Sequence, residues 1–355
     1  MRQPASTEFP WRRRHGRSLR VGLFLLAVTL LSTAPLANSA EPISVIVDTD
    51  MDSDCDDAGA LAMLHALADK GEVRLLATPV SARHRWSGPC VDAINTYFGR
   101  PDLPIGIPKA TPNKQGSRFA ETIAVEFDHD FPDQLDKQPD AVSVYREVLA
   151  RQPDDSVTLV TVGDLTNVRD LLDAKPDQFS PLDGLDLVRA KVKHWYCMGS
   201  RYPADRDPKR WGNFKMDPEA TVDAVRRWPG KITFTGGGPF AQRLSTGARL
   251  GELPSCNPIR RVYELYFGGK AKDRHSADQI TVMVAVRGTG TPWKLVTRGH
   301  NHLFSNGTHE WRESPDDTRH QFISSLEERT DPKEVAETIE TLMLHLPARR
   351  SPPNR

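Results

Sequence analysis

Six aspartates fall within ten residues, directly after the apolar pair Ile46 and Val47. They are Asp48, Asp50, Asp52, Asp54, Asp56 and Asp57. Packed at the end of a strand, these carboxylates would repel one another by several kcal/mol unless a cation neutralised them or some took up protons. A hard divalent ion, most economically Ca²⁺, suits such a cluster because it takes about six to eight oxygen ligands and prefers carboxylates. The aspartate run therefore predicts a metal site.

Known aspartate-rich motifs fit this run only in part. An EF-hand loop needs Gly at its sixth position and Glu at its twelfth, but counting from Asp48 places Ser53 and Gly59 there. Residues 48–52 partly match the Asp-x-Asp-x-Thr/Val start of haloacid dehalogenase phosphatases, although Asp52 stands at the last position. A solvated acidic turn is disfavoured because the run lies between strand-like and helix-like segments rather than in a disordered tract.

The elements that must position this loop alternate along the chain. Strand-like apolar runs occupy residues 43–47, 74–80, 156–162, 193–198 and 232–235, and helical patterns occupy 57–68, 88–97, 167–172 and 217–228. This alternation predicts an α/β fold with a mostly parallel central sheet and helices on both faces, as in Rossmann-like open sheets. Ligands of such sheets bind beyond the carboxyl ends of the strands, which is where the acidic loop lies.

The ends of the chain have compositions of their own. Residues 12–20 contain five arginines, followed by a largely apolar run at 21–31 and small residues before position 40, which is typical of a signal peptide. The apolar run is shorter than the roughly 20 residues of a membrane span, so we expect export to the periplasm or medium without a stable membrane anchor. Residues 41–346 are predicted to form the folded domain, and 347–355 a disordered tail.

Two further stretches lead to expectations. Residues 111–139 have the least regular pattern and are predicted to form a long loop. Residues 332–346 are predicted to form a helix capped by Asp331, and this helix is expected to pack on the outside of the sheet.

Composition narrows the classes of partner. Lys plus Arg and Asp plus Glu both number 47, so no basic field predicts a nucleic-acid partner. Four cysteines are too few for a disulfide scaffold in a chain of this length, and their spacing matches no zinc motif. These observations are compatible with an enzyme that acts on a small molecule.

The acidic run resembles a family signature once its neighbours are included. Residues 46–50 read Ile-Val-Asp-Thr-Asp, and Asp56, Asp57 and Ala58 open an Ala- and Leu-rich stretch. This order is similar to the Asp-Thr-Asp-Pro-Gly-x-Asp-Asp-Ala pattern of the inosine-uridine preferring nucleoside hydrolases. Here Pro-Gly is absent and the loop is two residues longer. Asp52 and Asp54 lie in this longer part, and are either solvated or an added feature of the site.

Three later segments resemble the same family in the same order. Residues 160–167 are similar to its Thr-Gly-Pro-Leu-Thr-Asn strand end, 213–220 to its Asn-x-x-x-Asp-Pro-Glu-Ala element, and 276–279 to a late segment that carries an aspartate. The resemblance covers nearly the whole predicted mature chain. It implies the family's α/β fold and, as activity, Ca²⁺-dependent hydrolysis of the N-glycosidic bond of ribonucleosides to ribose and free base.

The resemblance also implies a ligand set. Asp50, Asp57, the backbone carbonyl of Val162 and Asp278 would bind Ca²⁺, and Asp50 would also be the general base. N-glycosidic cleavage passes through an oxocarbenium-like transition state, for which an activated water is needed. Asp278 taken alone could also be a surface acid before a strand.

The implied substrate contacts are less complete. Asp56 would bind a ribose hydroxyl and Asn213 would hold the sugar, although Asn213 could instead cap the next helix. Trp211 stands where the common enzymes carry Glu for the 5′-hydroxyl, and could stack on the substrate together with Trp195 and Tyr196.

Other family features are missing. Where the family has a Val-x-Gly-Asn element after the second strand, Ala82 and Arg83 stand in place of Gly and Asn. Ala277 replaces a His that protonates the leaving base in some members. Other candidates for that acid are His84, His194, His275, His300 and His302. These departures leave open a hydrolase of another riboside, or a catalytically weak ligand-binding protein. A homo-oligomer is possible, as in the family.

Overall fold

The computed structural model describes residues 41–109, 116–202, 206, 207, 209 and 212–347. The predicted signal peptide and nearly all of the predicted tail lie outside these residues, so export and the tail stay predictions. The described chain from Glu41 onward belongs to one compact unit. Within the described residues, no helix has both the length and the apolar character needed to cross a membrane.

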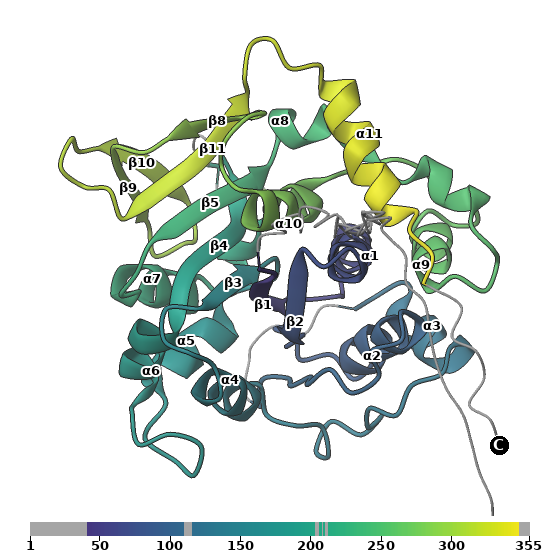
Figure 1. Ribbon diagram of the computed structural model, residues 1–355, viewed down its shortest axis with the longest axis horizontal. Helices are drawn as coiled ribbons and strands as arrows, with labels where there is room; N and C mark the ends of the chain where they lie inside the picture. The colour runs from purple at the N-terminus through teal and green to yellow at the C-terminus, as the bar shows by residue number, and fades with distance from the viewer. Residues whose placement is uncertain (1–40, 110–115, 203–205, 208, 210–211, 348–355) are drawn as a thin grey trace, which may run out of the picture. The chain divides into compact units, whose positions relative to one another are not determined.

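A seven-stranded sheet forms the centre of this unit (Figure 1). Its strands, in spatial order, are β2 (Val73–Ala77), β1 (Ile43–Asp48), β3 (Val157–Thr161), β4 (Val192–Arg201), β5 (Ile232–Gly237), β11 (His320–Leu326) and β8 (Trp293–Val296). All neighbours pair in parallel except β8, which runs antiparallel to β11. The predicted mostly parallel sheet is therefore confirmed, with one antiparallel edge strand.

Helices cover both faces, and each face has its own core (Figure 1). One layer contains α1 (Asp56–Asp69), α2 (Ser87–Tyr97), α3 (Ala120–Glu126), α9 (Pro258–Tyr266), α10 (Ala277–Arg287) and α11 (Pro332–Met343). The other contains α4 (Ala141–Ala150), α5 (Thr166–Asp173), α6 (Gly184–Lys191) and α7 (Pro218–Arg227). Successive side chains of a strand point to opposite faces, so Val45 and Val47 enter the first core and Ile46 the second.

The close approach of α1 and α10 positions two parts of the acidic site. Gly59 faces α10, and a Cβ at this position would lie 2.4 Å from Nε2 of Gln279 and 2.8 Å from the hydroxyl of Tyr263. Because only glycine leaves room for this approach, it sets the distance between the two helices. Asp57 lies in the first turn of α1 and Asp278 in the first turn of α10, so both carboxylates reach the same end of the sheet.

Short elements complete the unit. They are α8 (Pro239–Gln242), the 3₁₀ turns η1 (Asn213–Lys215) and η2 (Ala248–Glu252), the antiparallel pair β6 (Ser245–Thr246) and β7 (Arg274–His275), and the hairpin of β9 (Gly299–Leu303) and β10 (His309–Glu313).

Two expectations need correction. The stretch 111–139 is not wholly a loop, because Phe119, Ala120 and Ile123 are buried and anchor α3. Asp331 does cap α11, accepting from the amide of Lys333 at 2.9 Å, but this helix packs against α1 and α10 rather than directly on the sheet.

Candidate metal centre and active site

All six aspartates of the loop are buried. The most exposed of them, Asp54, has a relative accessibility of 7%. The loop starts at the end of β1 and passes Met51, which has a positive φ of 42°. This conformation is strained for a non-glycine residue and is often found at functional sites. The alternatives that left Asp52 and Asp54 solvated, or the whole run as a surface turn, are therefore wrong.

Asp48 has a structural role. Its Oδ2 accepts hydrogen bonds from the hydroxyl of Tyr145 at 2.7 Å and from Nδ2 of Asn167 at 2.9 Å. Burial raises the pKa of Asp48 to about 8, against the opposing effect of these two bonds. Asp48 therefore ties the end of β1 to α4 and α5, as expected of a strand-end residue.

Asp57 is oriented by the loop that precedes it. The hydroxyl of Thr49 donates to Oδ1 of Asp57, and the amide of Met51 lies 3.4 Å from the same atom. Asp50 lies next to Asp57, and after burial the charge of Asp57 is the largest cause of the raised pKa of Asp50. The loop thus holds Asp57 and Asp50 side by side.

Two overlapping groups of side chains have the spacing of metal ligands. Asp54, Asp57 and Asp278 each present an oxygen within 4.8 Å of the other two, and Asp54, Asp56 and His275 each present a ligand atom at the same spacing. The structure therefore brings together Asp57 and Asp278, as predicted, and Asp50 borders them through Asp57. It adds Asp54, which belongs to the lengthened part of the loop.

Burial and mutual repulsion together raise the pKa values of these carboxyls. Burial and the neighbouring Asp54 raise the pKa of Asp57 to about 6, and burial with Asp57 raises that of Asp52 to about 7. The pKa values of Asp50, Asp56 and Asp278 are also raised well above the ordinary range by burial and adjacent carboxylates. A divalent cation would remove this repulsion.

Unsatisfied oxygens point to the same conclusion. Both carboxylate oxygens of Asp52 and Oδ1 of Asp56 are buried without a hydrogen-bond partner among the described residues. Buried polar atoms are normally paired, and a bound ion is one common reason when they are not. Carboxylates and carbonyls are the donors that a hard ion prefers, so the residues at this site fit a divalent metal.

Val162 and Asn213 lie beside this cluster. Residue 162 follows β3, and its amide donates to the carbonyl of Asp48 at 2.8 Å. A Cβ on the next residue, Gly163, would come within 2.7 Å of the amide nitrogen of Asp50. Nδ2 of Asn213 donates to the carbonyls of Val162 and Met198. Oδ1 of Asn213 is buried and has no partner among the described residues, so it can still accept from a sugar hydroxyl.

Arg274 was missed by sequence reasoning. Its Nη2 donates to Asp54 at 2.5 Å, and its Nε lies 3.8 Å from Asp56. Asp54 and Arg274 are separated by 220 residues in sequence. The only available signal was that Arg274 stands four positions before Asp278. This arginine neutralises part of the cluster and lies beside the Asp56 carboxylate, which was expected to bind the sugar.

Most of the proposed acids and stacking residues lie elsewhere. Burial and the charge of Arg274 lower the pKa of His275 to about 4, so this imidazole is neutral at pH 7. His300 and His302 lie on β9, and His194 stacks on Tyr196 at 4.2 Å. Trp195 is fully buried and packs against Trp228. It therefore belongs to the hydrophobic core and does not stack on the substrate. Trp211 lies outside the described residues.

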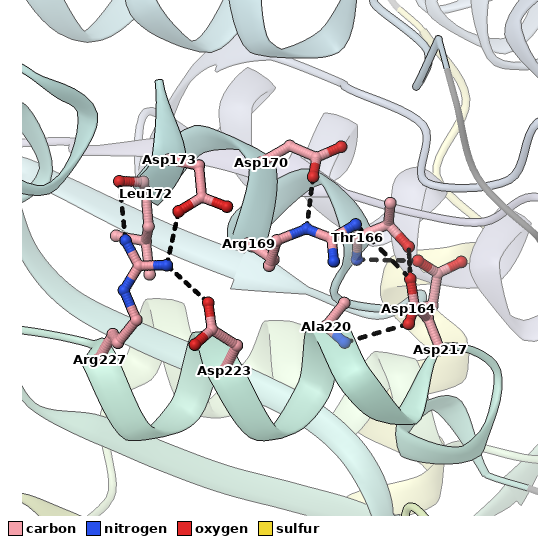
Figure 2. Close-up of polar contacts among 10 residues, drawn as sticks. All are labelled: Asp164, Thr166, Arg169, Asp170, Leu172, Asp173, Asp217, Ala220, Asp223 and Arg227. Atoms are coloured by element: carbon pink, nitrogen blue, oxygen red, sulfur yellow. Dashed lines mark hydrogen bonds and ion pairs between the residues drawn. The ribbon is translucent and has the colours of Figure 1, made fainter. Parts of the chain in front are cut away.

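Asp217, from the element that resembles Asn-x-x-x-Asp-Pro-Glu-Ala, is a helix cap. Its carboxylate accepts from the amide of Ala220 and the hydroxyl of Thr166, both at 3.0 Å, and so joins α7 to α5 (Figure 2). Further along the same interface, Arg227 bonds Asp173 at 2.7 Å and Asp223 at 2.6 Å. These acids have structural partners.

Solved structures share the fold. A plant nucleoside hydrolase superposes with a TM-score of 0.61 at 16% identity, covering 85% of this chain and 99% of that chain. The inosine-uridine preferring nucleoside hydrolase from Bacillus anthracis superposes with a TM-score of 0.60 at 16% identity, covering 85% of this chain and 99% of that chain. The type III effector protein XopQ complexed with adenosine diphosphate ribose superposes with a TM-score of 0.60 at 16% identity, covering 86% of this chain and 93% of that chain. Neither a protein-family model nor a curated protein matches this sequence. The chain therefore has the nucleoside hydrolase fold, which confirms the sequence resemblance at the level of the fold.

Proposed function

We propose that this protein is a metal-dependent hydrolase that cleaves the N-glycosidic bond of ribonucleosides and releases ribose and a free base. The observation that carries the proposal is the convergence of Asp54, Asp57 and Asp278, whose oxygens lie within 4.8 Å of one another. They meet where ligands of parallel sheets bind. Solved proteins of the same fold include nucleoside hydrolases, which supports this reaction class.

Ca²⁺ is the ion that we propose for this cluster. Asp57 and Asp278 would hold it together with Asp54, and Asp50 and the Val162 carbonyl would complete its ligands. All of these donors are oxygens, the ligands that Ca²⁺ prefers. When bound, the ion would supply a more acidic water and an anchor for sugar hydroxyls.

The chain's own groups would move the proton and hold the sugar. Asp50 lies beside Asp57, and once a cation neutralised the cluster its ionised carboxylate would accept the proton of the attacking water. Asn213 offers its unpaired Oδ1 to a ribose hydroxyl. Asp56 offers its unpaired Oδ1 in the same way, on the side of the cluster next to Arg274.

A panel of nucleosides and other ribosides, assayed for free reducing ribose with Ca²⁺ present, tests the proposal. We expect wild type to release ribose, and Asp50→Ala to be slower by roughly 10²- to 10⁴-fold, the usual contribution of general acid–base catalysis. Asp170→Ala is the matched control, because Asp170 pairs with Arg169 on α5, away from the acidic loop. It should match wild type.

Two results would count against the proposal. Equal release by wild type and Asp50→Ala would remove Asp50 as the base. No release from any member of the panel would remove the hydrolase function and favour a ligand-binding protein of the same fold.

A further inference from the structure

A cavity of about 320 Å³ opens beside the acidic cluster, at the carboxyl ends of β4 and β5. Its charged lining side chains are Arg201 and Arg274, and none of the described residues that line it is a carboxylate. Gly212, the residue before Asn213, also lines it. One end of the substrate site is therefore rich in carboxylates, while the space next to it is cationic.

Arg201 is the last residue of β4 and extends over the turn that follows β5. Its Cγ and Nη1 lie 3.5 and 3.6 Å from the position that a Cβ would take on Gly238. Gly238 has a φ of +93°, which L side chains rarely adopt, so the glycine keeps this turn open beneath the guanidinium. None of the described residues forms an ion pair with Arg201, so its charge is available to a ligand.

Arg274 is held in place from the opposite side. Asp54 anchors one end of its guanidinium, at 2.5 Å, and the guanidinium carbon Cζ lies 5.6 Å from the centroid of the Tyr266 ring. Nε is buried and lies 3.8 Å from Oδ1 of Asp56. A guanidinium that is fixed in this way and lines the cavity is preorganised to contact an anion, because little side-chain entropy remains to be lost.

We propose that this cavity is an anion subsite that selects ribosides carrying a phosphate group. The proposal rests on the function proposed above, because it places the ribose at Asn213 and the acidic cluster, with its phosphate in the adjoining cavity. Guanidinium groups bind phosphate oxygens through paired, charge-assisted hydrogen bonds. A neutral nucleoside would bring no anion to Arg201.

Calorimetric titration with D-ribose and D-ribose 5-phosphate tests the subsite without relying on catalysis. With Ca²⁺ present, we expect wild type to bind the phosphorylated sugar roughly ten- to a hundredfold more tightly, the range for charged hydrogen bonds. Arg201→Gln should lose this preference and keep its affinity for ribose. Arg243→Gln is the matched control, since Arg243 is exposed and does not line the cavity. It should behave as wild type.

Failure of the subsite and failure of the hydrolase can be told apart. Equal affinity for the two sugars, or a preference that survives Arg201→Gln, overturns the subsite, whatever the nucleoside panel gives. Binding of neither sugar also overturns it, because the cavity would not accept its smallest ligand. Arg201-dependent binding of ribose 5-phosphate, with no hydrolysis of any riboside or its 5′-phosphate, would uphold the subsite and remove the hydrolase.

Discussion

Aspartates gather in two regions of this molecule, the loop between β1 and α1 and the interface between α5 and α7. At the helix interface, Arg227 bonds Asp173 and Asp223, and Arg169 bonds Asp170 (Figure 2). In the loop, only Arg274 among the described residues forms ion pairs with the six aspartates. The interface is therefore balanced within the chain, whereas the loop leaves room for a positive charge from outside.

The pKa values of Asp223 and Asp57 illustrate this difference. Although burial opposes it, hydrogen bonds from Arg227 and Arg226 hold the pKa of Asp223 below its ordinary value. Burial and Asp54 raise the pKa of Asp57 to about 6. A lowered pKa marks a carboxylate that the fold stabilises as an ion, and a raised pKa marks one that it does not. Asp content alone therefore does not indicate a candidate metal site, and buried aspartates without basic partners are the more specific signal.

The largest expected effect is the loss of calcium-dependent stability on changing Asp57 to Asn. At calcium concentrations about 100-fold above its dissociation constant, wild type should gain about 2.7 kcal/mol in unfolding free energy. Asp57→Asn should lose most of this gain, because it removes a carboxylate that Thr49 and Met51 hold in the cluster. Thermal unfolding with calcium and with a chelator measures both gains.

Asp223→Asn is the control for this comparison, since it removes a carboxylate from the balanced interface. It should keep the full calcium gain. If calcium stabilises Asp57→Asn as much as wild type, or does not stabilise wild type, the loop is not the metal site.

The second effect is a fall in the stability of the metal-free protein as pH rises, which calcium should oppose. Burial raises the pKa of Asp48 to about 8 and of Asp52 to about 7. In the unfolded chain these carboxyls ionise near 3.8. Between pH 6 and pH 8 the folded state therefore holds more protons than the unfolded state, so the stability of metal-free protein falls as pH rises. The slope is up to about 1.4 kcal/mol per pH unit for each carboxyl still protonated.

Calcium favours the ionised form of its own ligands, such as Asp57, whose pKa burial and Asp54 raise to about 6, so the stability that calcium adds should be larger at pH 8 than at pH 6. Unfolding curves at both pH values, with calcium and with chelator, give the difference. The stability with calcium minus the stability with chelator, taken at each pH, cancels titrating groups that calcium does not affect. One such group is the buried His65, whose pKa is lowered to about 3. A calcium gain that shrinks as pH rises would contradict the assignment of buried, protonated carboxyls.

The elements around the loop were predictable because their signals are local. The strand before Asp48 and β3 to β5 follow continuous apolar runs, and α1 is rich in Ala and Leu, which favour helices. Like α1, α10 is buried along nearly its whole length, so it has no polar face. Its sequence is rich in Ile, Thr and Val, which favour strands, and packing against α1 and the sheet decides the helix instead.

The parts of the candidate site that lie close together in sequence were also predictable, and the parts that depend on tertiary contacts were not. Asp50 and Asp57 lie within one short loop, and the position of Asp278 came from a resemblance in its own segment. The pairing of Asp54 with Arg274 joins residues 220 positions apart, and no local pattern indicates it. The cationic cavity depends on the same tertiary contact, so it could be recognised only from the fold.

A third effect follows from Arg274, the arginine that pairs with the loop. Arg274→Met removes the partner of Asp54 and Asp56, so metal-free stability should fall by about 2 kcal/mol, between the values for exposed and buried pairs. Calcium affinity should rise, because a positive charge leaves the neighbourhood of the ion. Calorimetric titration with calcium measures this. Arg227→Met, at the balanced interface, should leave calcium affinity unchanged; a drop in affinity for Arg274→Met would show that this arginine supports the metal site.

The smallest effect belongs to Asp217, which lies in a segment that resembles the substrate site but has the contacts of a cap. Asp217→Ala removes the acceptor for the amide of Ala220 and should cost about 1 kcal/mol in unfolding free energy, as for other helix caps. Because its carboxylate faces Thr166 rather than the acidic loop, the calcium gain should equal that of wild type. Chemical denaturation with and without calcium measures both quantities. If the calcium gain falls together with stability, the interface of α5 and α7 is coupled to the metal site, and the two aspartate regions are not independent.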